Sequence, residues 1–377
     1  MTVDDSYDVI VVGVGGMGSA TVFHLAKRGY DVLGLEKFDI PHNRGSSHGL
    51  TRLIRLAYFE NPWYVPLVKR AYQLWQALED RSGWDILYPV GAIDIGPSDS
   101  DLVTGAKEAC DEHGLTHETL SGKEVSDRFP GFSLPSNYSA VYQSQGGFLV
   151  PERGIVAHVR AAQDHDGEIH GHEPVEDWYS TSGGICLETA QASYRADTLV
   201  VTCGAWAGKL LPEISEKIVP SRITVGWFEP SVNAFSQERF PVFNLAGQSG
   251  EFYGTPEFRI PGFKIGRVDD TPNEIDPSEF KQDPTQQEEQ QLREAATRYL
   301  AYEDGPTMRL DTCMVTHSPD GHFILDSTLD HSNVLVGAGF SGHGFKFCPV
   351  VGEILADLVE SGTTSHDISK FRIDRLF

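Results

Sequence analysis

Cysteine is scarce in this chain, and its few thiols show no pairing pattern. The 377 residues include five cysteines, and no two of them stand in a Cys-x-x-Cys spacing. They are Cys110, Cys186, Cys203, Cys313 and Cys348. An odd number of unclustered thiols argues against a disulfide framework and against a zinc knuckle. We therefore expect a protein of a reducing compartment, without a metal site.

Positive charge is also in short supply. Lys and Arg number 30 against 54 Asp and Glu, which gives a formal net charge of −24 at pH 7. Such a surface repels phosphate backbones and anionic lipid, so neither nucleic acid nor a membrane surface is an expected partner. Only 11 of the 30 basic residues are lysines. Acidic excess with little lysine suits a protein adapted to high salt, which screens the repulsion, and it suits an ordinary acidic cytosolic enzyme equally well.

Long apolar runs are missing as well. No segment approaches the roughly 20 apolar residues that a membrane-spanning helix needs. The N-terminal sequence Met-Thr-Val-Asp-Asp-Ser-Tyr is acidic where a secretory signal is basic. We therefore expect a soluble, cytoplasmic protein, and its length favours two closely joined domains over a single core.

The N-terminal segment carries the most specific pattern. An apolar run at residues 8–12 leads into Gly13, Gly15 and Gly18 at the spacing Gly-x-Gly-x-x-Gly, and Glu36 ends a second apolar run. Strand, turn, helix, strand and acid in this order predict a βαβ unit that binds a dinucleotide. The first glycine allows the tight turn, the second lets the backbone approach a pyrophosphate, and the third permits close packing of helix and strand. The glutamate is expected to accept hydrogen bonds from a ribose diol.

Hydrophobic periodicity and the positions of Gly and Pro predict the other elements. Helices are expected at residues 62–80, 99–113, 152–163, 291–300 and 350–360. Strands followed by glycine turns are expected at residues 196–207 and 333–347, with short strands at 86–148 and a strand-rich stretch at 222–268. Residues 269–291 are polar and contain prolines, so we expect a surface excursion that leads into the helix at 291–300.

The two later strand-and-glycine segments favour one cofactor. A nicotinamide enzyme usually builds its nucleotide domain from one continuous stretch, whereas here strands near residues 197 and 334 are needed to complete the first unit. FAD is therefore the expected cofactor, with the substrate as reductant. Oxygen or another external acceptor must then take the electrons onward.

Further motifs follow in a fixed order along nearly the whole chain. They are Gly45-Ser-Ser-His-Gly-Leu-Thr-Arg-Leu-Ile-Arg55, Cys203-Gly-Ala-Trp206, Phe252-Tyr-Gly254, Gly262-Phe-Lys-Ile-Gly266, Thr312-Cys-Met314 and Gly339-Phe-Ser-Gly-His-Gly-Phe-Lys346. With the N-terminal unit, they make the chain resemble the monomeric sarcosine oxidase and N-methyltryptophan oxidase family of flavin-dependent amine oxidases.

The resemblance implies an α/β fold with an α+β second domain. The first domain would be a discontinuous Rossmann FAD-binding domain of the glutathione-reductase type, and the second an inserted substrate domain with an antiparallel sheet. We assign residues 1–85, 145–220 and 315–377 to the FAD-binding domain, and residues 86–144 and 221–314 to the substrate domain.

The resemblance also assigns roles to single residues. Cys313 matches the cysteine that is bonded through its sulfur to the flavin 8α-methyl carbon, an 8α-S-cysteinyl link. Arg55 and Lys346 match the pair that fixes the substrate carboxylate, where a guanidinium can hold both oxygens. His48 and Arg52 match residues beside the flavin ring, where positive charge favours the anionic reduced flavin.

Other matched positions concern oxygen, the substrate pocket and the cofactor. Lys264 matches the lysine that activates oxygen, and Tyr253 matches a residue of the substrate pocket. Where sarcosine-oxidising relatives have a histidine, this chain has Val268, which leaves the choice of amine open. The later motifs add four glycines to the cofactor site: Gly204, Gly339, Gly342 and Gly344.

Simpler explanations exist for several of these residues. Cys313 could be an unmodified buried thiol, the usual state of a free cysteine. Arg55 could belong to a surface ion pair. Lys264 and Lys346 could face solvent.

The implied reaction is oxidation of a secondary amine, with sarcosine or N-methyltryptophan as model substrates. The resulting imine hydrolyses to an aldehyde and a primary amino acid, and oxygen is reduced to hydrogen peroxide. The resemblance leaves related functions open: an oxidase of cyclic imino acids or of sugar-modified amines, and a dehydrogenase that uses an acceptor other than oxygen. A flavin-binding protein without catalysis is the alternative outside enzymes. The resemblance implies a monomer whose partners are a small amine and oxygen.

Overall fold

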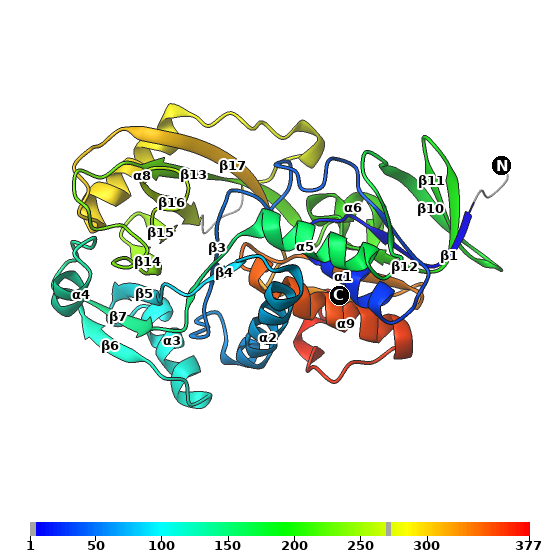
Figure 1. Cartoon of the computed structure of the whole chain (residues 1–377), viewed down its shortest axis with the longest axis horizontal. Coiled ribbons are helices and arrows are strands. Elements are labelled where there is room, and N and C mark those ends of the chain that lie inside the picture. The colour runs from blue at the N-terminus through cyan, green and yellow to red at the C-terminus, as the bar shows by residue number, and fades with distance from the viewer. Residues whose placement is uncertain (1–4, 269–272) are drawn as a thin grey trace.

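The structure, a computed structural model, describes residues 5–268 and 273–377. In this part of the chain two eight-stranded sheets and one three-stranded sheet form the framework. Figure 1 shows the two large sheets at opposite ends of the molecule, with α2 (Val65–Ser82) between them on one side. The fold is therefore α/β with several sheets, as the sequence predicted.

The first large sheet contains the N-terminal strand. Its strands are β1 (Asp5–Val12), β2 (Val32–Leu35), β9 (Glu168–His170), β10 (Val175–Thr181), β11 (Gly184–Thr189), β12 (Ser193–Val201), β18 (Ile324–Ser327) and β19 (Val334–Ala338). β1 runs parallel to β2 and β12, β2 is parallel to β9, and β12 is parallel to β19. The strands expected near residues 197 and 334 do complete the N-terminal unit.

Helices cover this sheet. They are α1 (Gly16–Lys27), α5 (Pro151–Gln163) and α9 (Cys348–Ser361). α1 packs against both α5 and α9, and α2 packs against the same two helices. Local chemistry sets their ends: α2 stops at Gly83 (φ 70°) and α9 at Gly362 (φ 71°), since glycine adopts this left-handed conformation without strain.

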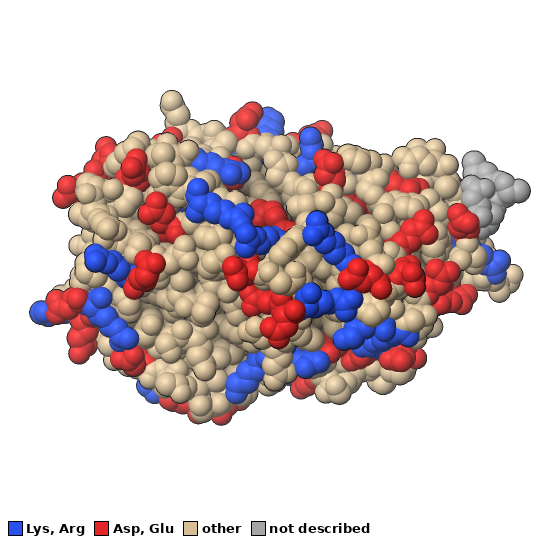
Figure 2. Space-filling model, viewed as in Figure 1, with Lys and Arg blue, Asp and Glu red and all other residues tan. Residues whose placement is uncertain are grey.

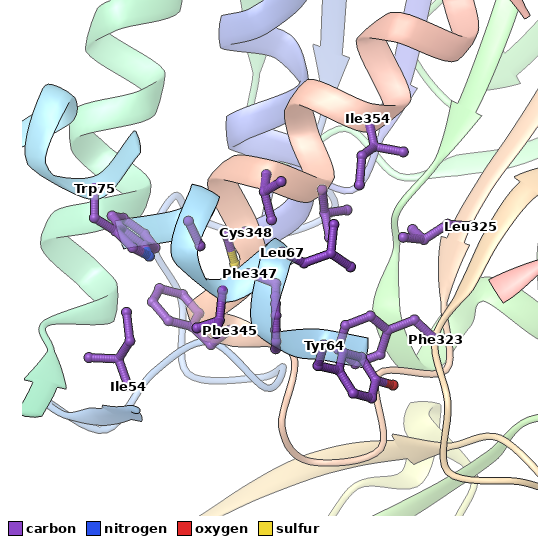
Figure 3. Packing of buried hydrophobic residues seen from close by; sticks show 14 of the residues in the cluster. Ile54, Tyr64, Leu67, Trp75, Phe323, Leu325, Phe345, Phe347, Cys348 and Ile354 are labelled. Atoms are coloured by element: carbon purple, nitrogen blue, oxygen red, sulfur yellow. The ribbon is translucent and has the colours of Figure 1, made fainter. Parts of the chain in front are cut away.

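A buried aromatic cluster joins α2 to the start of α9. Figure 3 shows Trp75 of α2 beside Phe345, and the two aromatic rings stack with centroids 5.8 Å apart. The indole Nε1 of Trp75 also donates a hydrogen bond of 2.9 Å to the carbonyl of Lys346. Because both contacts are buried, the core fixes the backbone that carries this lysine.

The second large sheet has eight strands. In spatial order they are β17 (Thr307–His317), β13 (Val219–Phe228), β16 (Phe263–Val268), β15 (Gly250–Thr255), β14 (Val242–Gly247), β5 (Ala92–Pro97), β7 (Tyr138–Gln143) and β6 (Glu118–Ser121). All neighbours are antiparallel except β14 and β5, which run parallel. Successive side chains point to opposite faces, and the central strands β13, β16, β15, β14, β5 and β7 each place residues of one face in an aromatic core.

Three helices accompany this sheet: α3 (Asp101–Glu112), α4 (Gly122–Arg128) and α8 (Gln286–Tyr299). The sequence placed the start of the last helix at residue 291, and the structure corrects this. α8 begins five residues earlier because Thr285 and Glu288 form a capping box that satisfies its first N–H groups. Of the predicted surface excursion, residues 269–272 lie outside the described residues.

A small sheet and two short helices complete the framework. The sheet consists of β3 (Arg52–Ile54), β8 (Gly147–Leu149) and β4 (Leu87–Tyr88), and the helices are α6 (Ala207–Leu210) and α7 (Pro212–Ser215). The expected domain boundaries stay a prediction. Each helix in the described ranges is too short or too polar to cross a membrane.

Candidate active site

A cavity of about 560 Å³ collects most of the residues that the sequence singled out. Twelve of the predicted positions line it: Gly13, Gly15, Glu36, Arg52, Arg55, Gly204, Tyr253, Cys313, Gly339, Gly342, Gly344 and Lys346. The walls come from both large sheets, since β1, β2, β15 and β17 all contribute. The cavity therefore lies where the two sheets meet.

The glycine turn before α1 leaves space in the cavity. Gly13 has a φ of 91°, and a Cβ added there would lie 2.5 Å from the Cα of Cys203. A Cβ on Gly18 would lie 1.8 Å from the carbonyl oxygen of Gly13, which explains the close fit of α1 on β1. Beside Gly15, in contrast, a Cβ would meet no atom within 4 Å. The open space at this turn, with no side chain capping α1, suits an anionic group held by helix N–H groups.

Glu36 stands at the end of β2 and is already partly engaged. Its carboxylate accepts hydrogen bonds from the backbone N–H groups of Val14 (2.9 Å) and Phe38 (3.0 Å). Burial raises the pKa of this carboxyl, although the backbone N–H groups oppose that shift. A carboxylate offers about four acceptor sites, so capacity remains for ribose hydroxyls.

Near the Glu36 end of the cavity, one buried hydrogen-bond donor has no partner among the described residues. The indole Nε1 of Trp206 is buried and has no hydrogen bond among the described residues, although the side chain lines the cavity. Together with the open space at Gly15 and the carboxylate of Glu36, this donor fits a polar, phosphate-bearing dinucleotide. The residues present therefore fit FAD.

Arg55 follows β3 and is buried, with 3% of its surface exposed. It donates to the carbonyl of Ala57 and to Oε2 of Glu60, the latter at 2.6 Å, and its Nε lies 3.7 Å from Oδ1 of Asp94. Burial would lower the pKa of the guanidinium, but the two carboxylates outweigh burial and raise it. A surface ion pair is therefore the wrong explanation for this arginine. It is a buried cation with two internal counter-ions.

Lys346 lies in the turn before α9 and is also buried, with 5% exposed. Its Nζ donates to the carbonyl of His343 at 2.9 Å and lies 5.2 Å from the ring centre of Tyr58. Burial and the nearby Arg55 lower the pKa of the ammonium to about 7. The suggestion that this lysine faces solvent is wrong.

Glu60 and Asp94 were missed by the sequence reasoning. Burial raises the pKa of Glu60, but Arg55, His343 and Lys346 act in the opposite direction, and the pKa is lowered overall. For Asp94, burial dominates and raises the pKa to about 6. The signal for the aspartate was present in the sequence, because a charged residue stands inside the apolar run at residues 91–96.

Lys264 lies on β16 and is completely buried, so a solvent-facing role is wrong for it too. Its Nζ donates to the carbonyls of Gly49 (2.9 Å) and Thr51 (3.1 Å). Burial and the neighbouring Arg52 lower its pKa to about 7. A Cβ on Gly49 would lie 3.5 Å from Nη1 of the arginine and 3.7 Å from Nζ of the lysine, so the two cations flank this glycine. The arginine lines the cavity and the lysine lies behind it.

Cys313 lies in the wall of the main cavity, whereas His48 lies in the wall of a neighbouring hollow. Cys313 lies on β17, is buried and lines the cavity, and burial raises the pKa of its thiol while Arg52 and Lys264 counteract the rise. His48 is buried but lines a neighbouring hollow instead. Burial and Arg52 lower the pKa of the imidazole to about 3, which keeps it neutral. The structure therefore does not bring His48 into the main cavity wall.

Tyr253 and Val268 lie on adjacent strands of the cavity wall. The Tyr253 ring covers Gly266, where a Cβ would lie 2.6 Å from the ring. Val268 lines the cavity, is 40% exposed and pairs with Glu251 across the strands. Val268, which stands where the resemblance implies a histidine, therefore lies at the open rim of the site.

The glycine turn, the carboxylate after β2 and the cavity between two sheets define a dinucleotide-binding enzyme. Residues 8–358 match the model of the family described as FAD dependent oxidoreductase. The chain therefore belongs to the FAD-dependent oxidoreductase family.

Individual relatives are similar over almost the full length. The chain is 40% identical to a monomeric sarcosine oxidase from Bacillus sp. (strain NS-129), with 98% of this chain and 97% of the relative covered. It is 32% identical to an N-methyl-L-tryptophan oxidase from Salmonella agona (strain SL483), with 98% and 99% covered. Among solved structures, NikD, described as an unusual amino acid oxidase, superimposes with a TM-score of 0.87 at 25% identity and covers 98% of this chain and 97% of its own.

Proposed function

We propose that this protein is an FAD-dependent oxidase of secondary amines, with N-methyl amino acids as its substrates. The observation that carries the proposal is the buried pair of Arg55 and Lys346 in the wall of a cavity fitted for a dinucleotide. Two buried cations in one cavity wall suit an organic carboxylate. The relatives named as sarcosine and N-methyl-L-tryptophan oxidases support an N-methylated amino acid as the bearer of that carboxylate.

The chain's own residues would hold FAD along the cavity. The turn at Gly13 and Gly15 and the N-terminus of α1 would face the pyrophosphate, and Glu36 would face a ribose. Gly204 and the later glycine motif would lie along the cofactor. When bound, FAD accepts a hydride equivalent from the amine.

Arg55 and Lys346 would position the substrate. Since Nη2 of Arg55 holds Glu60, a substrate carboxylate must compete with this glutamate for the guanidinium. Fixing the carboxylate leaves the amine and its N-methyl carbon as the groups free to approach the reacting end of the cofactor, and this restriction of motion is itself catalytic. Tyr253 forms the neighbouring wall.

The amine is expected to react in its neutral form. His343 of the cavity wall and His48 of the neighbouring hollow are held neutral, because burial lowers their pKa to about 4 and about 3. Neither imidazole therefore carries a positive charge near neutral pH. An amine that binds without its extra proton needs no dedicated base.

The remaining roles concern the cofactor's attachment and the second substrate. Cys313 is proposed as the covalent anchor, supported by its burial in the cavity wall and by the cations Arg52 and Lys264 beside it. Those cations would favour negative charge on the reduced cofactor and on oxygen. His48 is proposed to stay uncharged close to Arg52 and Lys264.

The test is an oxidase assay with a panel of amines. Sarcosine, N-methyltryptophan, proline, pipecolate and a fructosyl amino acid are offered in air, and hydrogen peroxide and oxygen uptake are followed. We expect one peroxide per N-methyl amino acid oxidised. Turnover only with an artificial acceptor would indicate a dehydrogenase, and activity only on proline, pipecolate or the fructosyl compound would replace the proposed substrate class. The monomeric state and the cytoplasmic location stay predictions.

A further inference from the structure

Three residues form a polar row across the second large sheet. Asp94 of β5 pairs with Asn244 of β14, and Asn244 pairs with Tyr253 of β15. Cross-strand partners point to the same face of a sheet. Their chain neighbours Ile93 and Phe243 point to the other face, into the aromatic core. The row therefore faces the cavity side, where Figure 1 shows β5, β14 and β15 within one end of the molecule.

Asp94 lies at the back of this row and is only 1% exposed. Its Oδ1 accepts a hydrogen bond of 2.7 Å from Nδ2 of Asn244 and lies 3.7 Å from Nε of Arg55. One buried carboxylate thus contacts both the arginine proposed to hold the substrate and an asparagine beside it. Burial raises the pKa of this carboxyl to about 6, and Arg55 and the hydrogen bond from Asn244 oppose the rise, so the aspartate is mainly ionised at pH 7.

The contact with Asp94 sets the orientation of Asn244. An ionised carboxylate only accepts hydrogen bonds, so the NH₂ end of the amide must point toward it. The carbonyl oxygen Oδ1 then points away from Asp94. Asn244 lines the cavity, Asp94 does not, and the described residues offer no further side-chain hydrogen bond to this amide. An acceptor oxygen is therefore presented to the cavity, near Arg55 and Tyr253.

We infer that Asn244 is a specificity-determining residue, and that it selects an N-methyl amino acid whose side chain carries an N–H or O–H donor. Asp94 is the positioning residue that holds the amide. The inference rests on the proposed function, since it describes the side chain of the same substrate whose carboxylate binds Arg55 and Lys346.

The charged groups around the site favour a substrate side chain that donates a hydrogen bond. The cations Arg55 and Lys346 are balanced by Glu60 and Asp94 within the same cluster. Glu251 lines the outer cavity and points to the same face as the polar row, since it lies two residues before Tyr253 on β15. An apolar substrate side chain packed against Asn244 would leave Oδ1 of the amide without water and without a hydrogen-bond donor. A hydroxyl, amide or ammonium group on the substrate would donate to this oxygen.

The experiment compares matched substrates on the holoenzyme. N-methylserine is compared with N-methyl-2-aminobutyrate, and N-methyllysine with N-methylnorleucine, and sarcosine serves as the substrate without a side chain. We expect kcat/KM to favour at least one donor-bearing substrate over its apolar partner by about tenfold or more, since an unpaired buried acceptor is costly. In Asn244→Leu the ratio of kcat/KM within each matched pair should fall to within about twofold.

Two further variants separate specificity from folding. Asn233→Leu changes an exposed asparagine and should leave the preference unchanged. Asp94→Asn keeps the shape of the side chain but no longer requires the NH₂ end of Asn244 to point toward position 94, so the preference for the donor-bearing substrate should weaken, mainly through KM. Thermal unfolding of each variant shows whether a loss reflects specificity or instability.

The outcomes distinguish this inference from the proposed function. Oxidation of sarcosine with equal kcat/KM within both matched pairs would overturn the inference and leave the proposed function standing. A donor preference that survives intact in Asn244→Leu would also overturn it. Failure to oxidise any N-methyl amino acid would overturn the proposed function and, with it, the substrate class inferred here.

Discussion

Nη2 of Arg55 lies 2.6 Å from Oε2 of Glu60, so the cation proposed to hold a substrate carboxylate already holds one from its own chain. Both side chains are largely buried, with 3% and 19% exposed. In such surroundings the ion pair is poorly screened by solvent. The glutamate therefore acts as an internal competitor of the substrate, and it also keeps the arginine from being an unpaired buried charge.

Glu60→Gln is expected to strengthen binding and weaken the fold. Without the negative charge, Arg55 and Lys346 attract an external anion more strongly, and we expect the Kd of propionate to fall by about tenfold, which corresponds to about 1.4 kcal/mol. The free energy of unfolding should fall by about 1–3 kcal/mol, because the arginine loses a buried partner. Titration with propionate and urea unfolding measure the two effects. Glu238→Gln, at an exposed position, is the control, and weaker propionate binding in Glu60→Gln would contradict the competitor role.

Binding of a carboxylate should depend on pH through Lys346. Burial and Arg55 lower the pKa of this ammonium to about 7, so it is charged below that pH and neutral above it. Affinity for propionate, which has no amine of its own to titrate, should therefore be high in mild acid and fall by about tenfold as the pH rises through 7. Asp94, with a pKa raised to about 6 by burial, gains negative charge in the same direction. Lys346→Met should bind weakly at every pH, and an unchanged pH profile in that variant would show that another group is responsible.

Gly15 and Gly18 should respond differently to substitution. A side chain at Gly15 meets only open cavity, so Gly15→Val should fold but occupy the space of the pyrophosphate and lower the FAD content of the purified protein. A Cβ at Gly18 meets the carbonyl of Gly13 at 1.8 Å, so Gly18→Ala should destabilise the fold by roughly 1–3 kcal/mol or more. Absorbance of the flavin and thermal unfolding distinguish the two. Full FAD content in Gly15→Val would place the cofactor elsewhere.

The proposed covalent link predicts where the yellow colour goes after acid denaturation. With Cys313 bonded to the flavin, the colour stays in the protein pellet, because acid unfolds the chain without breaking a thioether. Cys313→Ser should release the colour into the supernatant, and Cys203→Ser, the other cysteine of the cavity wall, should retain it. Colour released from the unmodified protein would refute the link.

The sequence predicted the parts of this protein that depend on local pattern. Glycines at fixed spacing determine the turn before α1, and a strand register that buries apolar residues determines β1, β2, β12 and β19. Placement of Arg55 and Lys346 in one wall was also predicted, although only through family resemblance. The early start of α8 was not, because a capping box at Thr285 and Glu288 outweighed the polar composition of the segment.

The sequence did not predict which side chains pair with one another in the folded protein. Glu60 is near Arg55 in the chain, yet its role as a counter-ion depends on both being buried. Asp94 and Asn244 are 150 positions apart and meet only because β5 and β14 run side by side. Periodicity identifies strands but does not say which strands become neighbours, so a polar row that crosses a sheet has no signature in the chain.

The high-salt explanation for the acidic surface stays a prediction, and Figure 2 shows acidic and basic side chains interspersed on the face it presents.

The central claim is that a secondary amine, held by its carboxylate at Arg55 and Lys346, reduces FAD in this cavity. The most direct measurement adds sarcosine and the N-methyl amino acids named above to the yellow protein without oxygen, and then admits air. The account predicts that at least one of them bleaches the flavin, that air restores the colour with one equivalent of hydrogen peroxide, and that Arg55→Met is not bleached at the same concentration. A flavin that stays oxidised with every N-methyl amino acid, in protein shown to contain FAD, would contradict it.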